Sequence, residues 1–381
     1  MKLNDIAEFV TDKISSSGIS LDRYVTTDSL LQNRRGRETA QNLPPMPCAL
    51  THYRQGDVLV ANIRPYLKKV WYADSEGGCS SDVLAFRAKK GHCPSFLYTV
   101  LMQDAFFDYA MSGAKGSKMP RGDKDQIMRY ELPTFTPMEE ENIGNMMVEI
   151  MSKIKVNRQI NDNLEAMAKQ LYDYWFVQFD FPNEEGKPYK SSGGAMVWNE
   201  KLKREIPQGW IASNYTDLFT IGNGQTMPQN EGFIPAYGGN GIVKMVEISN
   251  YPACIIIGRV GANCGSIHYS KVPCWVSDNA ISVCSKNDDW QPFLFYSFRL
   301  YNLSKNKGGS SQPLITHEAL KHLYFPMSEK HINQFCHIVN ELQDLIYSNQ
   351  QEILKLTKLR DELLPLLMNG QASVNYHLSA Y

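Results

Sequence analysis

Two groups of side chains have the types and spacing needed to contact a nucleic acid. The first places cations beside an aromatic ring at the end of a predicted strand and consists of Arg64, Tyr66, Lys68 and Lys69. A loop containing Gly113 and Gly116 adds Lys115, Lys118 and Arg121. Because glycine lets a loop come close to a phosphate backbone, these cations suit phosphate contacts that position a protein on nucleic acid.

The second group occupies matching places in the second half of the chain. Its members are Arg259, Asn263, His268, Ser310, Ser311 and Gln312. Guanidinium, amide and hydroxyl groups are those that read base edges in the major groove. Ordinary solvated loops carry the same side chains, and this alternative stays open for individual members of both groups.

Catalytic and metal-binding patterns are missing from the sequence. Gly258–Gly265 lacks the spacing of a dinucleotide-binding loop, and Gly113–Lys118 lacks that of a P-loop. We find no zinc-protease helix, no nucleophile elbow and no Cys/His nucleophile pattern, so we predict no active site and no metal. Four cysteines recur every ten residues, at Cys254, Cys264, Cys274 and Cys284. Zinc ligands are usually two to four residues apart, so this spacing favours buried thiols.

Bulk properties set broad limits. The 381 residues are enough for two domains, and the formal net charge of −1 argues against a protein that coats nucleic acid non-specifically. No apolar run approaches the roughly 20 residues of a membrane span. The charged N-terminus has no signal-peptide core, so we expect a cytoplasmic protein.

The elements that must position these side chains form a mixed α/β unit over residues 1–137. Strands are predicted within 56–64, 68–72 and 82–86, with Gly77-Gly78 separating the last two. Pro94 is expected to open a helix. A long helix of roughly 60 Å should then run over residues 138–181.

The second half of the chain repeats this plan. After a linker over 182–205, we predict a second unit over 206–327, a second long helix over 328–370 and a tail over 371–381. Ile143 through Leu171 match Phe335 through Leu363 at a constant offset of 192, whereas offsets drift between about 192 and 198 in the globular parts. We therefore predict an α+β fold with a pseudo-twofold repeat, in which two domains with twisted β-sheet cores are joined by two antiparallel, coiled-coil-like helices.

Apolar side chains at heptad positions should form the interface between these two helices. The predicted interface residues are Ile150, Ile154, Asn157, Leu164, Met167, Leu171, Leu342, Ile346, Asn349, Leu356, Leu359 and Leu363. An asparagine interrupts the apolar seam at the same position of each helix. We expect Asn157 and Asn349 to face each other as one buried polar layer that fixes the helix register.

Three segments resemble a known family across essentially the whole chain. Asn157–Pro182, with the sequence NRQINDNLEAMAKQLYDYWFVQFDFP, closely resembles the central conserved region of the specificity subunit (HsdS) of type I restriction-modification systems. Leu356–Gly370 is similar to the C-terminal conserved region of that family. Ile206–Trp210 resembles the usual entry to its second target recognition domain.

The resemblance implies a DNA reader that is not itself an enzyme. Its two target recognition domains would each read half of a split site, and its helices would set the length of the unread spacer. The helices would also dock two modification subunits, which methylate adenine with S-adenosylmethionine, while restriction subunits use ATP and Mg. No cofactor is implied for this chain. The recognition domains vary within the family, so none of its base contacts carries over.

Two other functions fit parts of the sequence. A coiled-coil adaptor that joins two protein-interaction domains and has no role on DNA would need the same helices. A self-sufficient methyltransferase or nuclease would need catalytic motifs that this sequence lacks.

Overall fold

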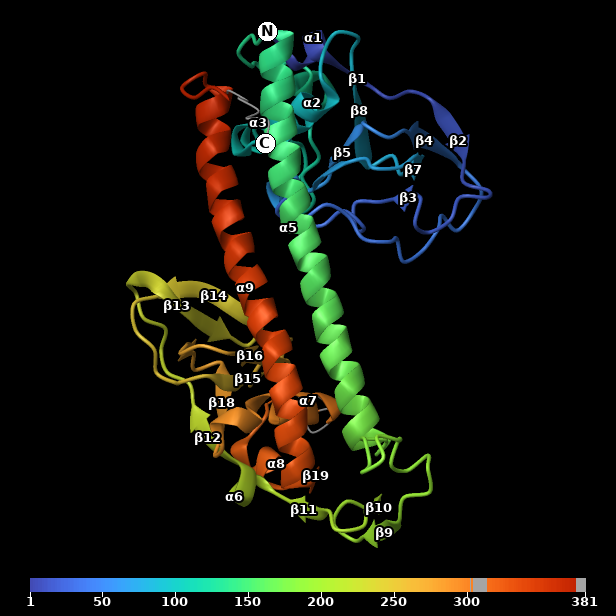
Figure 1. Ribbon diagram of the computed structural model, residues 1–381. Coiled ribbons are helices and arrows are strands. Elements are labelled where there is room, and N and C mark those ends of the chain that lie inside the picture. Colours follow the sequence, from blue (N-terminus) through green and yellow to red (C-terminus); the bar gives the residue numbers. More distant parts are fainter. Residues whose placement is uncertain (302, 304–313, 375–381) are drawn as a thin grey trace, which may run out of the picture. The chain divides into compact units, whose positions relative to one another are not determined.

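The computed structural model describes residues 1–301, 303 and 314–374 (Figure 1). The chain forms two compact units. Unit 1 contains Met1–Arg158 and the C-terminal segment from Gln351 onward, and unit 2 contains Gln159–Gln350. The division falls within both long helices, so each unit contains one half of each helix.

Unit 1 is built on two four-stranded sheets. The first has the order β1-β8-β5-β6 and is antiparallel throughout, with strands β1 (Ala7–Phe9), β8 (Val83–Ala88), β5 (Val58–Ala61) and β6 (Val70–Tyr72). The second has the order β2-β4-β7-β3, with strands β2 (Lys13–Ser15), β4 (Ala49–Tyr53), β7 (Gly77–Cys79) and β3 (Tyr24–Val25). The strands predicted within 56–64, 68–72 and 82–86 are confirmed as β5, β6 and β8.

Gly77-Gly78 separates β6 from β8 in sequence as predicted, but both glycines also lie in a buried strand of their own, β7, which was not predicted. A Cβ on Gly77 would meet the Arg23 carbonyl oxygen at 2.1 Å, and one on Gly78 would meet the side chain of Ile19 at 2.7 Å. The absence of a side chain is therefore what lets the neighbouring backbone pack against this strand.

Short helices complete unit 1. They are α1 (Leu3–Ile6), the 3-10 helix η1 (Pro65–Leu67), α2 (Pro94–Leu101), α3 (Asp104–Ser112) and α4 (Lys124–Ile127). Pro94 occupies the first turn of α2 as predicted, where its missing N–H costs nothing. Phe96 and Val100 of α2 share a core with Val58 and Val60 of β5.

Unit 2 contains a four-stranded antiparallel sheet with the order β12-β18-β15-β16. Its strands are β12 (Phe219–Asn223), β18 (Ala280–Ser285), β15 (Cys254–Gly258) and β16 (Ile267–Ser270). A three-stranded sheet has the order β14-β13-β17, with β14 (Gly241–Val246), β13 (Glu231–Gly238) and β17 (Trp275–Val276). The helices are α6 (Tyr215–Leu218), η3 (Asp288–Trp290), α7 (Gln291–Leu300) and α8 (His317–Lys321).

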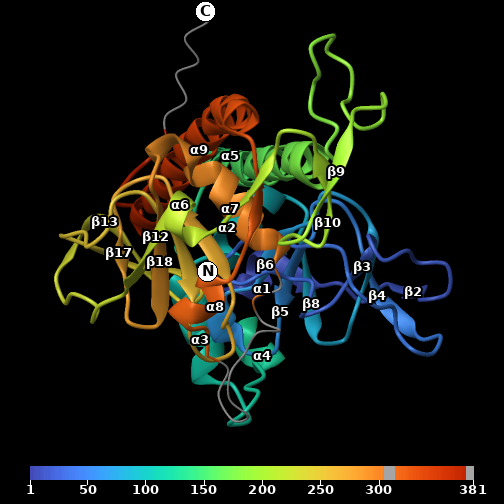
Figure 2. The same cartoon turned by 90° about the horizontal axis from the view of Figure 1, so that it is seen from below.

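The predicted linker contains regular structure. Strands β9 (Met196–Asn199) and β10 (Arg204–Pro207) form an antiparallel hairpin, which Figure 2 shows as a separate element. Strand β11 (Ile211–Ser213) then pairs with β19 (Phe325–Met327). Composition alone pointed to a linker because glycine, proline and serine are dense just before β9.

The main sheets of the two units have the same register. In unit 1, Val58 of β5 lies opposite Phe86 of β8 and Tyr72 of β6. In unit 2, positions 197 residues later do the same, because Ile255 lies opposite Val283 and Tyr269. The predicted internal repeat is therefore a repeat of strand register, and in these three strands its offset is constant.

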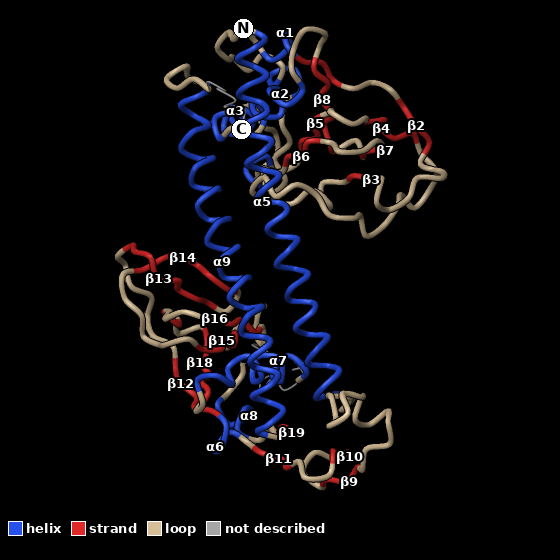
Figure 3. The backbone as a smooth tube through the Cα atoms, in the orientation of Figure 1, coloured by secondary structure: helices blue, strands red, loops and turns tan. Residues whose placement is uncertain are grey.

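The two long helices are α5 (Pro137–Tyr172) and α9 (Glu329–Met368). Figure 3 shows each as one continuous helix. The first was predicted to end near residue 181, but its α-helical part ends at Tyr172 and continues as a π-helical segment, η2 (Asp173–Val177). Such segments are rare, and this one leaves Trp175 and Phe176 buried in the core of unit 2.

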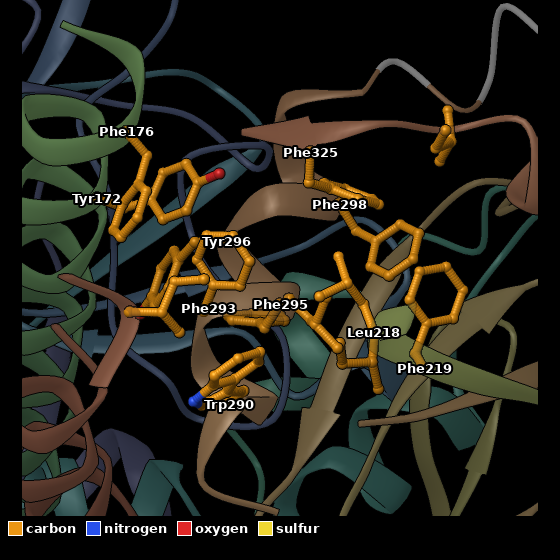
Figure 4. Close-up of a cluster of buried hydrophobic side chains, with 14 of the residues drawn as sticks. Tyr172, Phe176, Leu218, Phe219, Trp290, Phe293, Phe295, Tyr296, Phe298 and Phe325 are labelled. Carbon is orange, nitrogen blue, oxygen red and sulfur yellow. The ribbon is translucent and has the colours of Figure 1, made fainter. Parts of the chain in front are cut away.

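Within each unit the two helix halves pack antiparallel. In unit 1, Ile154 shares a core with Leu364 and Leu367. In unit 2, the end of α5 packs on the start of α9, and ring centroids of Tyr172 and Phe335 lie 5.7 Å apart. Figure 4 shows the aromatic cluster around α7 that this packing completes.

Three predictions about the helix interface need correction. Met167 and Leu359 are 56% and 42% exposed, so they lie outside the packed seam. The two asparagines have partners other than those expected: Asn157 Nδ2 donates to Glu352 Oε2 at 2.7 Å, and Asn349 Nδ2 donates to Asn161 Oδ1 at 3.0 Å. Each asparagine therefore forms a hydrogen bond between α5 and α9 within its own unit. Ile150, Ile154, Asn157 and Ile346 are buried, and the remaining predicted interface residues are partly buried, namely Leu164, Leu171, Leu342, Asn349, Leu356 and Leu363.

Candidate nucleic-acid interface

The two basic segments predicted in unit 1 meet in the structure. Ile63, which follows β5, forms an isolated β-bridge with Arg121. The adjacent Arg64 N–H donates to the Pro120 carbonyl oxygen at 2.7 Å. Side chains that are about 55 residues apart in sequence therefore belong to one surface, which we call the basic loop pair and define as residues 64–69 and 115–121.

The first loop of this pair has an uncommon backbone. Arg64 and Lys68 flank η1 with φ angles of +53° and +50°, in the left-handed region. Non-glycine residues rarely adopt it, and they cluster at functional sites when they do. The conformation holds Arg64 and the half-exposed Tyr66 at the surface.

Three of the six cations of the basic loop pair have carboxylate partners. Lys68 Nζ lies 2.5 Å from Asp104, Arg121 lies 2.6 Å from Asp82, and Lys115 lies 3.3 Å from Asp123. Arg121 and Lys115 are 57% and 85% exposed, so these two pairs are weak and can exchange a carboxylate for a phosphate. Lys118 is exposed as well.

Lys69 differs from the other predicted contacts. Its ammonium donates to the carbonyl oxygen of Thr27 within the protein, and burial lowers the pKa of the group. Lys69 therefore stabilises the loop in this structure, and its role as a direct phosphate contact remains a prediction.

Unit 2 repeats the loop arrangement. Val260 forms an isolated β-bridge with Leu314, 197 and 193 positions after Ile63 and Arg121 respectively. Arg259 is partly buried and Asn263 is exposed in the turn that follows β15. The predicted contacts Ser310, Ser311 and Gln312 lie outside the described residues.

His268 lies in a different environment from the loop residues predicted with it. It is in strand β16, where its Cα is opposite Ile256, and it is only partly exposed. Burial lowers the pKa of its imidazole, and its buried Nε2 lacks a hydrogen-bond partner in the described ranges. Because Nε2 is buried, the neutral ring can present Nδ1 to a base edge as one donor or one acceptor, and it has no charge to offer a phosphate.

A second histidine and a cluster of arginines were not predicted from the sequence. Burial and the charge of Arg259 lower the pKa of His317, which opens α8. In unit 1, a cavity of about 350 Å³ is lined by basic side chains; we call it the arginine pocket, and its basic lining residues are Arg34, Arg35, Lys155 and Arg158. The run Arg34-Arg35-Gly36-Arg37 was a visible signal, but Arg158 joins it only through the fold.

The cysteines are free thiols. Cys254, Cys264 and Cys274 are buried as predicted, and Cys284 is partly buried. Cys254 Sγ and Cys274 Sγ are 3.6 Å apart. Over the described ranges, no cluster of three or more His, Cys, Asp or Glu side chains could hold a metal ion, and no helix has the length and apolar character to cross a membrane.

Comparison with known proteins identifies a matching family model and relatives of similar sequence. The family model described as the type I restriction modification DNA specificity domain matches residues 207–360. The chain is 24% identical over 369 residues to the MjaIX specificity subunit of Methanocaldococcus jannaschii, covering 89% of this chain and 83% of that one. It is 22% identical over 456 residues to the HindI specificity subunit of Haemophilus influenzae, covering 97% and 98% respectively.

A solved structure shows the same fold. The crystal structure of the S subunit of a type I restriction-modification system from M. genitalium superimposes with a TM-score of 0.63. The match covers 97% of this chain and 95% of that one at 16% identity.

Proposed function

We propose that this chain, which belongs to the specificity subunits of type I restriction-modification systems, reads a split site in double-stranded DNA with one recognition domain in each unit. The observation that carries the proposal is the repeated strand register. The family model matches only residues 207–360, but β5, β6 and β8 of unit 1 pair as β15, β16 and β18 do in unit 2. Each unit therefore supplies one reader.

The polar side chains of the loops support different DNA contacts in the two units, to phosphates in unit 1 and to base edges in unit 2. In unit 1 the basic loop pair offers exposed cations that suit phosphate oxygens. In unit 2 the turn after β15 offers Arg259 and Asn263, whose guanidinium and amide suit the edges of guanine and adenine. A formal net charge of −1 limits non-specific attraction to DNA, so base contacts would contribute strongly to affinity.

Partner proteins are part of the proposal. Exposed apolar side chains occur on both long helices, including Val156 and Leu354 in unit 1 and Ile160 and Leu345 in unit 2. Exposed apolar patches commonly mark protein interfaces. These helices would dock the modification subunits, and the complex would work with restriction subunits in the cytoplasm. The chain itself would be non-catalytic, with S-adenosylmethionine, ATP and Mg bound by its partners.

The decisive experiment is methylome sequencing of a host that expresses this chain with its candidate modification subunits. A split motif with methylated adenines is expected, and it should disappear when this chain is deleted. Co-purification of the chain with modification subunits and no methylated motif in an active complex would contradict DNA reading. That outcome would instead support an adaptor that joins protein partners.

A further inference from the structure

The arginine pocket of unit 1 has unpaired positive charge. The Arg34 guanidinium donates hydrogen bonds to the Met102 carbonyl oxygen and to Asp104. Lys155 forms an ion pair with Asp74 at 3.0 Å. Arg35 and Arg158 form neither a hydrogen bond nor an ion pair with any side chain that the structure describes. Of the two arginines that remain available, Arg35 is on a loop and Arg158 is on α5.

The surroundings of Arg158 favour the arrival of an anion. The side chain is partly buried, and burial together with the charges of Arg35 and Arg360 lowers its pKa. A guanidinium stays protonated in proteins even so. Like charges held together and partly shielded from water repel one another, and a bound anion would remove that penalty.

The fold does not require these cations. The position 192 residues after Arg158 is Gln350, and the position 192 residues after Ser152 is Asp344. Arg360, buried in unit 1, corresponds to the fully buried Ala168 in unit 2. Because the same helical positions of unit 2 carry neutral or acidic side chains, the arginines of unit 1 need an explanation other than packing.

The pocket adjoins the basic loop pair. The backbone N–H of Asn33 donates to the Leu67 carbonyl oxygen, and that of Arg34 donates to the Lys68 carbonyl oxygen, both at 2.9 Å. Asp104 forms ion pairs with both Arg34 and Lys68. A DNA strand that contacts residues 64–69 would therefore pass close to the arginine pocket.

We propose that the arginine pocket binds a phosphate group, with Arg35 and Arg158 donating to its oxygens. The guanidinium fork matches two oxygens of one phosphate, which makes arginine suited to this anion. A phosphodiester of bound DNA is the favoured source because the pocket adjoins the basic loop pair, and to that extent the inference rests on the proposed function. A free nucleotide or inorganic phosphate compound has the same chemistry.

The test uses the full-length chain and three charge-neutral variants, Arg158→Gln, Arg35→Gln and the double variant. Arg129→Gln is the matched control, since Arg129 is an exposed arginine of unit 1 that follows α4, outside the pocket. Affinity for a DNA duplex and for inorganic pyrophosphate is measured by calorimetry over a range of salt concentrations. Thermal unfolding is measured in parallel to confirm that each variant folds.

The double variant should bind the duplex about tenfold more weakly, and the slope of log K against log salt should fall by about one for each phosphate that the protein no longer neutralises. Pyrophosphate binding should also be abolished, and Arg129→Gln should behave as the native chain. Loss of pyrophosphate binding with unchanged DNA binding would assign the phosphate site to a free ligand. Unchanged binding of both probes in the double variant would overturn the proposal, as would a native chain that binds neither.

Two further measurements separate this inference from the proposed function. A short poly-glutamate peptide that binds the native pocket in place of both phosphate probes would contradict a phosphate site and indicate an acidic protein partner. The preference for the methylated split motif over a scrambled duplex should be the same in the native chain and the double variant. If the native chain shows no such preference while pyrophosphate binding depends on Arg158, DNA reading fails and the phosphate site stands.

Discussion

The main sheets of the two units pair their strands identically but bury different chemistry at the same place. In unit 1, Asp57 precedes β5 and accepts two hydrogen bonds from Arg87 of β8, at 2.8 and 2.7 Å. The positions 197 residues later are Cys254 and Cys284, and hydrogen bonding with Cys274 and Cys284, together with burial, raises the pKa of Cys254. The ion pair of unit 1 is thus replaced by two cysteines in unit 2 without a change of register.

This difference indicates that both recognition domains depend on the same backbone pairing of their main-sheet strands, whereas the buried side chains can vary. Register in an antiparallel sheet is set by which residues face the core, and a shift of one residue would turn every side chain over. The second sheets are freer. Over the residues that the structure describes, the second sheet has four strands in unit 1 and three in unit 2, so the units differ outside the shared register.

The helices show a similar contrast between constant register and exchanged charge. In unit 1, Lys155 of α5 pairs with Asp74 of the loop after β6. In unit 2 the charges are reversed, because Lys271 after β16 pairs with Asp344 of α9 at 2.5 Å. Asp74 and Lys271 occupy equivalent positions of the two recognition domains, whereas on the helices Asp344 corresponds to Ser152, three residues before Lys155. An ion pair between the domain and a long helix is therefore common to both units, although its polarity and its exact helix position differ.

The largest expected effect tests whether the two cores depend equally on the helix that covers the main sheet. Phe293 of α7 packs against Phe176 with ring centroids 4.9 Å apart, and its counterpart Phe96 of α2 packs against Phe135 at 5.3 Å. Both side chains are fully buried. We expect Phe293→Ala to cost about 4 kcal/mol and Phe96→Ala about 3 kcal/mol, because Phe293 lies in the denser aromatic cluster.

Guanidinium unfolding of the full chain measures these losses, and hydrogen exchange resolved by mass spectrometry assigns each loss to its unit. Protection should fall first in the unit that carries the substitution. Equal losses, or a larger one for Phe96→Ala, would contradict the view that the aromatic cluster makes unit 2 more dependent on its helix.

The next effect concerns the exchanged buried groups. Asp57→Asn removes the buried carboxylate partner of Arg87 and leaves it the half-exposed Asp12 at 3.4 Å, and we expect a cost of about 3 kcal/mol. Cys254→Ala removes only a buried thiol, and we expect about 1 kcal/mol. Urea unfolding compares the two variants. A cost below about 1 kcal/mol for Asp57→Asn would show that the ion pair is as dispensable as the thiols.

Local signals revealed the elements that these predictions use. The apolar run Val58–Ala61, which follows the turn at Gly56, predicted β5, and Pro94 predicted the start of α2. The constant 192-residue offset identified the helix positions that fill the cores, such as Ile154 and Ile346. In each case the deciding interactions occur between residues near in sequence or one helical turn apart.

The parts that were not predicted depend on contacts distant in sequence. The role of Gly77 follows from the Arg23 carbonyl oxygen, which no local pattern indicates. The arginine pocket needs a loop residue, Arg35, to meet Arg158 on a helix. The partners of Asn157 and Asn349 depend on how far one helix slides along the other, and a heptad pattern fixes that only to within a turn.

A pH effect should distinguish the starts of the two long helices. In unit 2, the His331 ring packs against the Phe181 ring at a tilt, with centroids 4.0 Å apart, and burial, with a smaller contribution from Lys330, lowers the pKa of His331 to about 4. Protonation thus favours the unfolded chain, where the pKa is about 6.5. Unit 2 should keep its full stability above pH 6.5 and lose about 2 kcal/mol as the pH falls toward 4.

The corresponding residue of unit 1 is Glu139, 192 positions earlier. Hydrogen bonds from Thr136 lower the pKa of its carboxylate, so the stability that it contributes is present above its unfolded pKa and is lost only in stronger acid. Thermal unfolding between pH 4 and 7 should therefore show a destabilisation that His331→Gln abolishes. A pH dependence that persists in this variant would assign the effect to other groups.

The smallest expected effect concerns the asparagines at the same heptad position of both helices. Asn157 is 6% exposed and donates to Glu352, which also pairs with Lys153 at 2.6 Å. Asn157→Leu removes the hydrogen bond but leaves Glu352 paired, so the gain in apolar burial should nearly balance the loss, within about 1 kcal/mol. Asn349 is less buried, and its hydrogen bond is to the neutral Asn161, so Asn349→Leu should change stability even less.

The double variant then separates stability from register. If the asparagines fix how the helices align, replacing both by leucine should preserve or raise the unfolding midpoint while the methylated motif accepts more than one spacer length. Methylome sequencing with the double variant measures spacer length directly. A single, unchanged spacer would mean that the alignment is set by the apolar residues that each unit buries, such as Ile154 in unit 1 and Phe335 in unit 2, which the substitutions leave in place.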